Sequence, residues 1–436
     1  MKIQKIFIRT FTIIFYIMYS LKADKISDWT FAIYMDTGGH DLNYWLQKNT
    51  NDMALAKFDR KKLNIVTQVH IETQEASRYT IYNKKIKLLE NTTLSNDCGQ
   101  NIVDFVKFVA NKCPAKHYGL IFWGHGFGIL DPVCIQTNTG SFNWDIEPDE
   151  PGYVCNNGVC PLKIMNLLRQ EHTEYHKGFM FNDTQSFVSN KQMVQTLKTI
   201  KETVLNGQKL DIMGTDCCKM SMLEIVYQIK DFVNFFVGSQ NCELKDGWNY
   251  RDFFSSFNDE SLDTLAVVNN IIKTYDDYYV KNTIKGTYTL SAIDLSQIDS
   301  LVKNFNEIIV LMTKLMLDNK TLFKSLVLNA RINSPSMCSA SYYLDLWAVY
   351  NNLLEELCTQ EALVLDTKTV TELKELLLQG KTLIEQTVIA ISLGTAVKNF
   401  KGISFYFPRN KIDDSYIITK FGQETEWVSF LRDFIV

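Results

Sequence analysis

The sequence predicts an α/β fold in which helices flank a central, mostly parallel sheet, followed by a mainly helical C-terminal part. Two observations support this prediction. Short, continuous apolar runs, such as Trp29–Met35 and Tyr118–Trp123, have the composition of strands that are buried on both faces. Segments with apolar residues at helical spacing, such as Asn101–Ala110, alternate with these runs. Strands that alternate with helices are typical of a parallel sheet covered on both faces.

The remaining elements can be placed in order along the chain. Further strands are expected at Leu63–Ile71, Leu210–Gly214 and Phe232–Ser239, a hairpin at Tyr79–Leu89, and a helix at Ser221–Ile229. Beyond Tyr250 the pattern is mainly helical, with strand-like runs at Thr287–Ile293 and Gly402–Phe407. We therefore expect a first unit over residues 24–250 and a second over 251–436, with a soft boundary between them.

The composition excludes several classes of protein. The 436 residues carry 45 basic and 49 acidic side chains, so the net charge is −4 and there is no global basic field to attract nucleic acid. Hydrophobic residues make up 46% of the chain, which indicates a folded protein with a large core. The ten cysteines are spread too thinly for a disulfide scaffold, and each needs its own explanation.

The N-terminus has the pattern of a secretory signal. Lys2, Lys5 and Arg9 precede the uncharged run Thr10–Leu21, and Ala23 supplies a small residue for cleavage. We predict a signal peptide over residues 1–23 and a mature protein that is secreted or periplasmic. An uncleaved membrane anchor and an apolar terminus without a targeting role stay open as alternatives.

Two predicted strands end in residues that can carry out chemistry. His125 stands between Gly124 and Gly126, directly after Tyr118–Trp123, and Cys217 and Cys218 follow the strand at 210–214. Carboxyl ends of parallel strands meet at one edge of a sheet, so these residues are expected to share a crevice. A thiol near an imidazole suits acyl transfer, because the thiolate is the nucleophile and histidine transfers protons. A structural histidine and inert core cysteines are the alternative interpretation.

These residues resemble the clostripain family of cysteine peptidases, from the same clan as caspases, legumains and gingipains. The motif is a strand ending in His-Gly, followed by a strand ending in Asp-x-Cys-x-Met. Further segments extend the resemblance from about Trp29 to Pro408: Trp29–Asp36, Phe181–Leu197, Gly238–Tyr250, Leu290–Ile298 and Gly402–Pro408. The resemblance implies a caspase-like sandwich and a cysteine endopeptidase with protein or peptide substrates.

Residue by residue, the resemblance implies that His125 and Cys218 form the catalytic dyad. At the position of Cys217 the family usually has a small residue. Because a second thiol stands there in this sequence, Cys217 is the alternative nucleophile. The backbone amides near Gly126 and Cys218 are expected to hold the oxyanion. The same resemblance places Asp216 in an acidic pocket that selects Arg or Lys before the cut, since a carboxylate pairs with a guanidinium. Capping of the following helix is the other role open to Asp216.

A second carboxylate, Asp246, could complete this pocket, and an ordinary turn aspartate is its alternative role. The insertion over about 130–178 holds an acid-rich loop, for which a calcium site and a solvated loop are both open. Cys155, Cys160, His172 and His176 have spacing compatible with zinc, with a Cys155–Cys160 disulfide, or with free residues.

Members of this clan often cleave themselves between the two catalytic residues. Lys163, Arg169 and Lys177 are therefore candidate self-processing sites. The sequence as a whole predicts an exported cysteine endopeptidase of the clostripain type. We expect a monomer that requires no cofactor and has no metal-binding residues at the dyad. A related peptidase with another P1 preference, and a catalytically silent binding protein with this fold, are the alternatives.

Overall fold

The computed structural model describes residues 26–37, 42–70, 75–131, 135–136, 142–143, 187–258, 262–282, 284 and 286–435. The predicted signal peptide and most of the insertion lie outside the described residues. The same is true of Cys155, Cys160, His172, His176 and the three candidate processing sites. No helix in the described part of the chain has the length and apolar character needed to cross a membrane.

The centre of the fold is a nine-stranded sheet with the order β13-β10-β9-β8-β5-β1-β2-β3-β4. Its five middle strands, from β9 to β2, run parallel, and antiparallel pairs close both edges. The predicted central, mostly parallel sheet is therefore confirmed. The strands are β1 (Ser27–Asp36), β2 (Leu63–His70), β3 (Glu75–Tyr82), β4 (Lys85–Thr93), β5 (Ala115–Trp123), β8 (Leu210–Asp216), β9 (Val233–Gly238), β10 (Thr289–Asp294) and β13 (Val388–Leu393).

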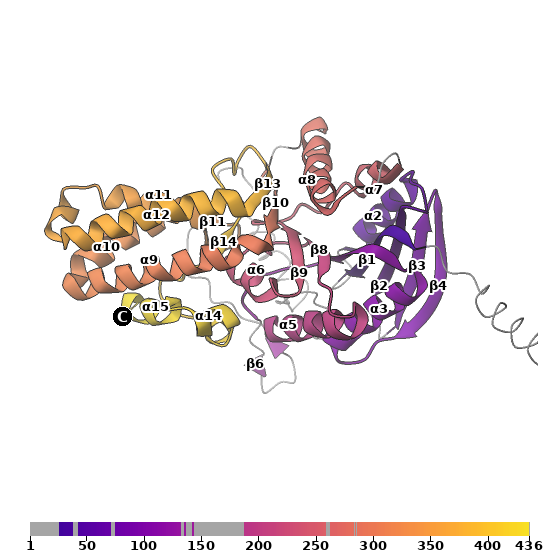
Figure 1. Cartoon of the computed structure of the whole chain (residues 1–436), viewed down its shortest axis with the longest axis horizontal. Coiled ribbons are helices and arrows are strands. Elements are labelled where there is room, and N and C mark those ends of the chain that lie inside the picture. The colour runs from indigo at the N-terminus through magenta and orange to yellow at the C-terminus, as the bar shows by residue number, and fades with distance from the viewer. Residues whose placement is uncertain are drawn as a thin grey trace, which may run out of the picture.

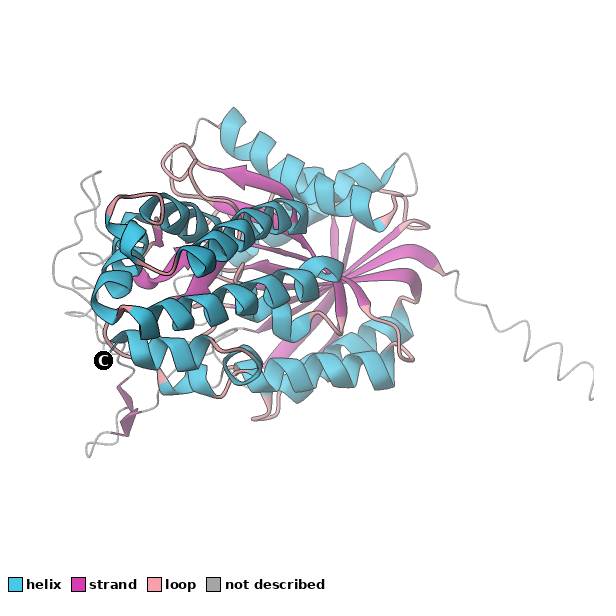
Figure 2. Cartoon of the chain, turned by 60° about the vertical axis from the view of Figure 1, so that its left-hand side comes forward, coloured by secondary structure: helices cyan, strands magenta, loops and turns pink. Residues whose placement is uncertain are grey.

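Helices cover both faces of this sheet (Figures 1 and 2). Strand β1 shows why, because its alternate side chains enter different cores: Phe31 and Ile33 belong to one cluster, Ala32 and Tyr34 to the other. The first cluster packs under α2 (Asn43–Leu55), α7 (Tyr250–Ser255) and α8 (Thr264–Lys281). The second packs under α3 (Cys98–Lys112), α5 (Asn190–Thr199) and α6 (Leu223–Ile229).

The C-terminal part is mainly helical, as predicted. Its helices lie at the end of the molecule opposite the β4 edge of the sheet (Figure 1). Its helices are α9 (Ile298–Asp318), α10 (Lys320–Asn333), α11 (Leu346–Glu356), α12 (Thr367–Thr387), α13 (Asp414–Ile417), α14 (Lys420–Glu424) and α15 (Trp427–Ile435). A small sheet contains β11 (Ser336–Met337), β12 (Ala340–Asp345) and β14 (Ser404–Tyr406). Both expected strand-like runs form strands, β10 and β14, whereas β12 and β13 were not predicted.

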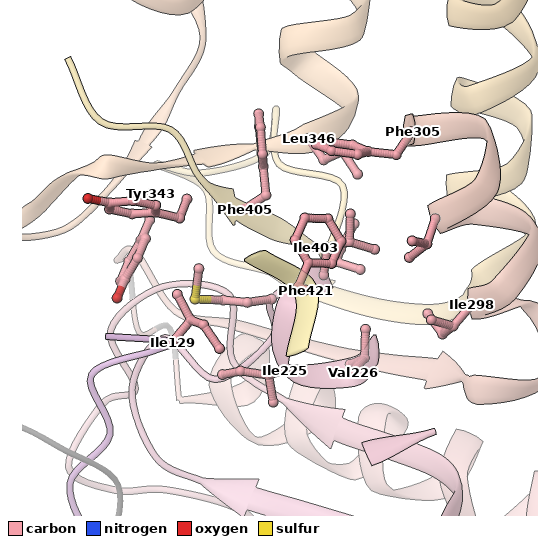
Figure 3. Close-up of a cluster of buried hydrophobic side chains, with 14 of the residues drawn as sticks. Ile129, Ile225, Val226, Ile298, Phe305, Tyr343, Leu346, Ile403, Phe405 and Phe421 are labelled. Atoms are coloured by element: carbon pink, nitrogen blue, oxygen red, sulfur yellow. The ribbon is translucent and has the colours of Figure 1, made fainter. Parts of the chain in front are cut away.

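The soft boundary near residue 250 stays a prediction. Two strands beyond it, β10 and β13, pair into the central sheet. The hydrophobic core also continues across it: Ile129 and Ile225 of the first unit lie in one buried cluster with Phe305, Phe405 and Phe421 of the second (Figure 3). The two parts of the chain therefore stabilise one another.

Glu224 of α6 is buried within this shared core. Its Oε1 accepts hydrogen bonds from the Tyr406 amide (2.7 Å) and the Tyr416 hydroxyl (3.0 Å), while burial raises the pKa of this carboxyl to about 7. A carboxyl group whose pKa is higher in the folded than in the unfolded state contributes its full stabilisation at low pH. For Glu224 this contribution to the unfolding free energy is lost as pH rises through about 7.

We therefore expect Glu224→Gln to flatten the pH dependence of stability. Between pH 4.5 and 8, wild type should lose roughly 3 kcal/mol more unfolding free energy than the variant, given about 1.4 kcal/mol for each pKa unit. Urea unfolding across this pH range measures the difference. The exposed Glu202→Gln is the control, and parallel curves for wild type and Glu224→Gln would contradict the assignment.

Candidate active site

The site lies where β5 and β8 end side by side. These strands pair in parallel, and Trp123 at the end of β5 lies opposite Asp216 at the end of β8. The loops that carry His125 and Cys218 therefore leave the same edge of the sheet, as the sequence predicts. The Gly124 amide donates a hydrogen bond of 3.3 Å to the Asp216 carbonyl, which ties the two loops together as they begin.

The loops touch at Gly126. A Cβ atom at this position would lie 2.6 Å from the Cys218 carbonyl oxygen and 2.9 Å from the Cys217 Cβ. These separations are shorter than van der Waals contact, so glycine is required for the backbones to approach so closely. The structure thus brings the His125 loop and the Cys218 loop into direct contact, with His125 half-buried beside them.

The two adjacent cysteines have different environments. Cys217 is 1% exposed and points into the core, where its thiol lies 3.6 Å from the Phe122 carbonyl oxygen. Burial, followed by the Asp216 charge, raises the pKa of Cys217 well above its usual value. Such a thiol stays protonated at neutral pH and is a poor nucleophile.

Cys218 is partly exposed, and its sulfur is surrounded by groups that favour the thiolate. Interaction with the Cys242 thiol is the largest influence and lowers the pKa of Cys218 against the opposing effect of burial. The Lys219 charge acts in the same direction, as does the Glu243 amide, which donates to Cys218 Sγ at 3.2 Å. Of the two thiols, Cys218 is the one prepared for nucleophilic attack.

Removal of the Cys242 thiol should therefore raise the pKa of Cys218. We expect Cys242→Ala to shift the alkylation of Cys218 by iodoacetamide to higher pH, by roughly one unit, the usual scale for one hydrogen bond to a charged group. Alkylation rates measured by mass spectrometry from pH 5 to 10 test this. Exposed Cys358→Ala should leave the profile unchanged, and an unshifted profile in Cys242→Ala would show that this thiol has no influence.

Two buried carboxyl groups, those of Asp216 and Glu243, lie close to the pair of cysteines. Asp216 is 5% exposed and accepts hydrogen bonds from the Tyr250 hydroxyl (2.8 Å) and the Trp248 amide (3.2 Å). Glu243 accepts one from the Tyr275 hydroxyl at Oε1 (2.6 Å), and the Ser239 hydroxyl also favours its ionised form, while its buried Oε2 makes no well-formed hydrogen bond with the described residues. Burial raises the pKa of Asp216 to about 7, and burial together with Asp216 raises that of Glu243 well above its usual value.

The alternative role for Asp216 as a helix cap is wrong. Helix α6 begins at Leu223 with Met222 at its N-cap, and the Asp216 carboxylate turns toward Tyr250 instead. Asp246 lies one residue before Gly247, whose backbone packs against the Asp216 carboxylate. Asp246 is partly exposed and forms an ion pair with Lys48 at 3.4 Å, so its charge already has a partner.

The C-terminal part contributes to the site, which the sequence did not reveal. The Tyr343 hydroxyl of β12 donates to the Phe127 carbonyl (2.9 Å) and accepts from the Leu130 amide (3.2 Å). It therefore holds the loop that carries His125. A role for Glu243 was not predicted from the sequence either. The roles of Cys242, Lys219 and Tyr343 depend on contacts between distant segments, whereas the position of Glu243, three residues before Asp246, was a signal that could have placed it in the predicted pocket.

The described residues contain no group of three or more His, Cys, Asp or Glu side chains arranged to hold a metal ion. The predicted calcium and zinc alternatives concern the insertion, in which 144–186 lie outside the described residues. The only insertion strands with described backbones are the short pair β6 (Ile135–Gln136) and β7 (Phe142–Asn143).

A half-buried histidine and a partly exposed thiol on touching loops, at one edge of a parallel sheet, are the groups that a thiol-dependent hydrolase needs. The family model described as the clostripain family matches residues 168–433, more than half of the chain. The chain therefore belongs to the clostripain family and is a cysteine peptidase that acts on proteins or peptides. The sequence-based resemblance is confirmed, and the alternative of a catalytically silent binding protein is set aside. Cys218 lies inside the matched range and His125 before it.

Solved structures with the same fold agree with this assignment. A secreted C11 cysteine protease from Bacteroides thetaiotaomicron, in complex with an irreversible peptide inhibitor, aligns with a TM-score of 0.59 at 15% identity, covering 92% of this chain and 100% of that one. An inactive zymogen C11 protease from Parabacteroides distasonis aligns with a TM-score of 0.56 at 15% identity, covering 95% and 100%. At this identity the likeness shows the fold alone. No curated protein sequence matches the chain.

Proposed function

We propose that the chain is an endopeptidase in which Cys218 is the nucleophile and His125 the proton donor. The thiolate attacks the scissile carbonyl carbon and forms a tetrahedral intermediate, whose oxyanion accepts hydrogen bonds from the amides near Gly126 and Cys218. His125 then protonates the departing amine, which leaves a thioester that water hydrolyses. The observation that carries this assignment is the contrast between the buried Cys217 thiol and the hydrogen-bonded Cys218 thiol.

We further propose that the peptidase cleaves after Arg or Lys. The carboxyl groups of Asp216 and Glu243 form a pair near the nucleophile, in which the Asp216 charge opposes the ionisation of Glu243. A cationic P1 side chain would relieve this repulsion and supply a partner for the buried Glu243 Oε2. Asp246, which was predicted in the same pocket, would contribute less because Lys48 already pairs with it.

A panel of reporter peptides that differ only at P1 tests the specificity. The reduced, purified protein should cleave substrates with Arg or Lys at P1 at least about 100-fold faster than those with Asp, Asn or Ala, the scale expected for a buried charge pair. Preference for an uncharged P1 residue would contradict the acidic pocket and favour the alternative of a related peptidase with different specificity.

Export and self-processing are also proposals. One relative is described as secreted and another as an inactive zymogen. Both descriptions support an exported protein with a signal peptide over residues 1–23 that is activated by cleavage, with Lys163, Arg169 and Lys177 as candidate sites. N-terminal sequencing of the fragments would identify the sites. A purified protein that stays a single band while fully active would contradict self-processing.

A further inference from the structure

Three thiols from three distant segments meet at the site. Cys218 follows β8, Cys242 follows β9, and Cys338 lies in the turn between β11 and β12. The Glu243 amide, directly after Cys242 in the chain, donates a hydrogen bond of 3.2 Å to Cys218 Sγ, and Cys242 Sγ lies 3.8 Å from the Cys338 carbonyl oxygen. Interactions with the Cys242 thiol also shift the pKa values of Cys218 and Cys338. The three cysteines are therefore neighbours in a row that begins at the proposed nucleophile.

Backbone contacts hold this row in place. Asn241, which is 2% exposed, accepts at its carbonyl from the Lys219 amide (2.8 Å) and at its Oδ1 from the Cys338 amide (2.7 Å). One residue thus anchors the loops on either side of Cys242. The strands that lead to the first two thiols are paired neighbours, with Thr215 opposite Gly238. The thiols are consequently close because of the fold and not because of flexible side chains.

We propose that the row is a disulfide-forming site, in which Cys242 resolves an oxidised Cys218 and Cys338 then releases it. The oxidant is a peroxide, a class that an exported thiol enzyme meets outside the reducing cytosol. The proposal rests on Cys218 as the reactive thiol and goes beyond the proposed function, because it assigns roles to two cysteines that peptide hydrolysis does not require.

The first two steps oxidise Cys218 and join it to Cys242 by a disulfide. The Cys218 thiolate attacks one peroxide oxygen, so that an S–O bond forms, the O–O bond breaks and the second oxygen leaves as water after taking a proton. Cys218 is thereby oxidised to a sulfenic acid and the peroxide is reduced. Cys242 then attacks the Cys218 sulfur, so that an S–S bond forms and the S–O bond breaks. The leaving hydroxide takes the Cys242 proton and departs as a second water.

The third step frees the nucleophile without a further redox change. Cys338 attacks the Cys242 sulfur, a new S–S bond joins Cys242 to Cys338, and Cys218 leaves as a thiolate while the Cys338 proton passes to solvent. The Glu243 amide and the Lys219 charge still lower the pKa of Cys218 after Cys242 has been oxidised, so Cys218 is the better leaving group of the two sulfurs in the first disulfide. The exchange therefore runs toward a free Cys218 thiolate and a Cys242–Cys338 disulfide.

Peroxide treatment followed by peptide mapping tests this site. In a Cys217→Ala background, which leaves one cysteine in tryptic peptide 210–219, brief oxidation should link this peptide to 231–245, which carries Cys242. Activity should fall as the linked peptide accumulates and return on addition of dithiothreitol. Longer incubation should move the link to 231–245 and 332–368, with activity partly restored before any reductant is added.

Variants in the same background separate the steps, each measured against its own unoxidised rate. Cys242→Ser should lose activity irreversibly, because an unresolved sulfenic acid proceeds to sulfinic acid, a mass increase of two oxygens on peptide 210–219. Cys338→Ser should accumulate the Cys218–Cys242 link, and exposed Cys358→Ser should behave like its parent. Equal reversibility in Cys242→Ser and its parent, or no linked peptide, would overturn the proposal.

The outcome also distinguishes this proposal from the proposed function. If Cys218 is needed for hydrolysis but no link to Cys242 forms, only the disulfide site is wrong. If Cys218→Ala stays active, the assignment of the nucleophile fails, whatever disulfides the protein forms.

Discussion

Replacement of Cys218 by alanine is expected to reduce peptide hydrolysis by at least about 10⁴-fold, the scale on which loss of a catalytic nucleophile acts in hydrolases. Among the cysteines that the structure describes, only Cys218 combines partial exposure with a lowered pKa. Steady-state rates on an Arg-P1 peptide, measured on reduced protein, give the loss. Because the side chain is small and partly exposed, the variant should remain folded.

The matched control is the neighbouring thiol. Cys217→Ala should keep kcat within a few-fold of wild type, at a cost of about 1 kcal/mol in stability for a small buried cavity. Equal survival of activity in both variants would remove Cys218 as the nucleophile. Loss in Cys217→Ala alone would exchange the roles of the two sulfurs.

Neutralisation of the buried carboxyl pair is expected to have the second-largest effect. Asp216→Asn and Glu243→Gln should each lower kcat/KM for Arg-P1 peptides by about 100-fold or more, since each removes a buried partner for the substrate cation. The loss for Ala-P1 peptides should be much smaller. A P1 panel run on wild type and both variants measures the change in selectivity.

The pH dependence of KM provides an independent test of the carboxyl pair formed by Asp216 and Glu243. The pKa of Asp216 is raised to about 7, so the pair is largely protonated below this pH and binds a cation weakly. KM for Arg-P1 peptides should therefore fall as pH rises through about 7, and this trend should weaken in Asp216→Asn. Asp246→Asn is the comparison, with a smaller expected loss because Lys48 pairs with Asp246. If Asp246→Asn alone removes the Arg preference, Asp246 and not Asp216 is the carboxylate that binds the P1 side chain.

Much of the fold was predictable from local sequence patterns. Strands buried on both faces, such as β1 and β5, are continuous apolar runs, and these are the elements the sequence placed most reliably. β13 was missed because partly exposed residues interrupt its apolar pattern. β12 was missed because it is short and leads directly into helix α11. That β10 and β13 join the central sheet follows from pairings over a long sequence separation, which no local pattern encodes.

The candidate site was predictable only in outline. A histidine and a cysteine at the ends of two buried strands are visible in the sequence, and parallel pairing of β5 and β8 then brings their loops together. The environment of each sulfur was not predictable. Whether Cys217 or Cys218 points into the core depends on the local backbone, and the influence of Cys242 depends on the packing of the next strand. The tertiary structure therefore distinguishes the environments of the two adjacent thiols, and these environments support the resemblance-based preference for Cys218.

The most direct test of the nucleophile assignment is the site of covalent labelling by a substrate-like inhibitor. A peptide chloromethyl ketone with Arg at P1 should inactivate the reduced protein and form a thioether on one sulfur. Fragmentation of tryptic peptide 210–219 distinguishes the two cysteines. The structure predicts a single adduct on Cys218, with Cys217 unmodified. An adduct on Cys217, or inactivation that leaves both sulfurs free, would contradict Cys218 as the nucleophile.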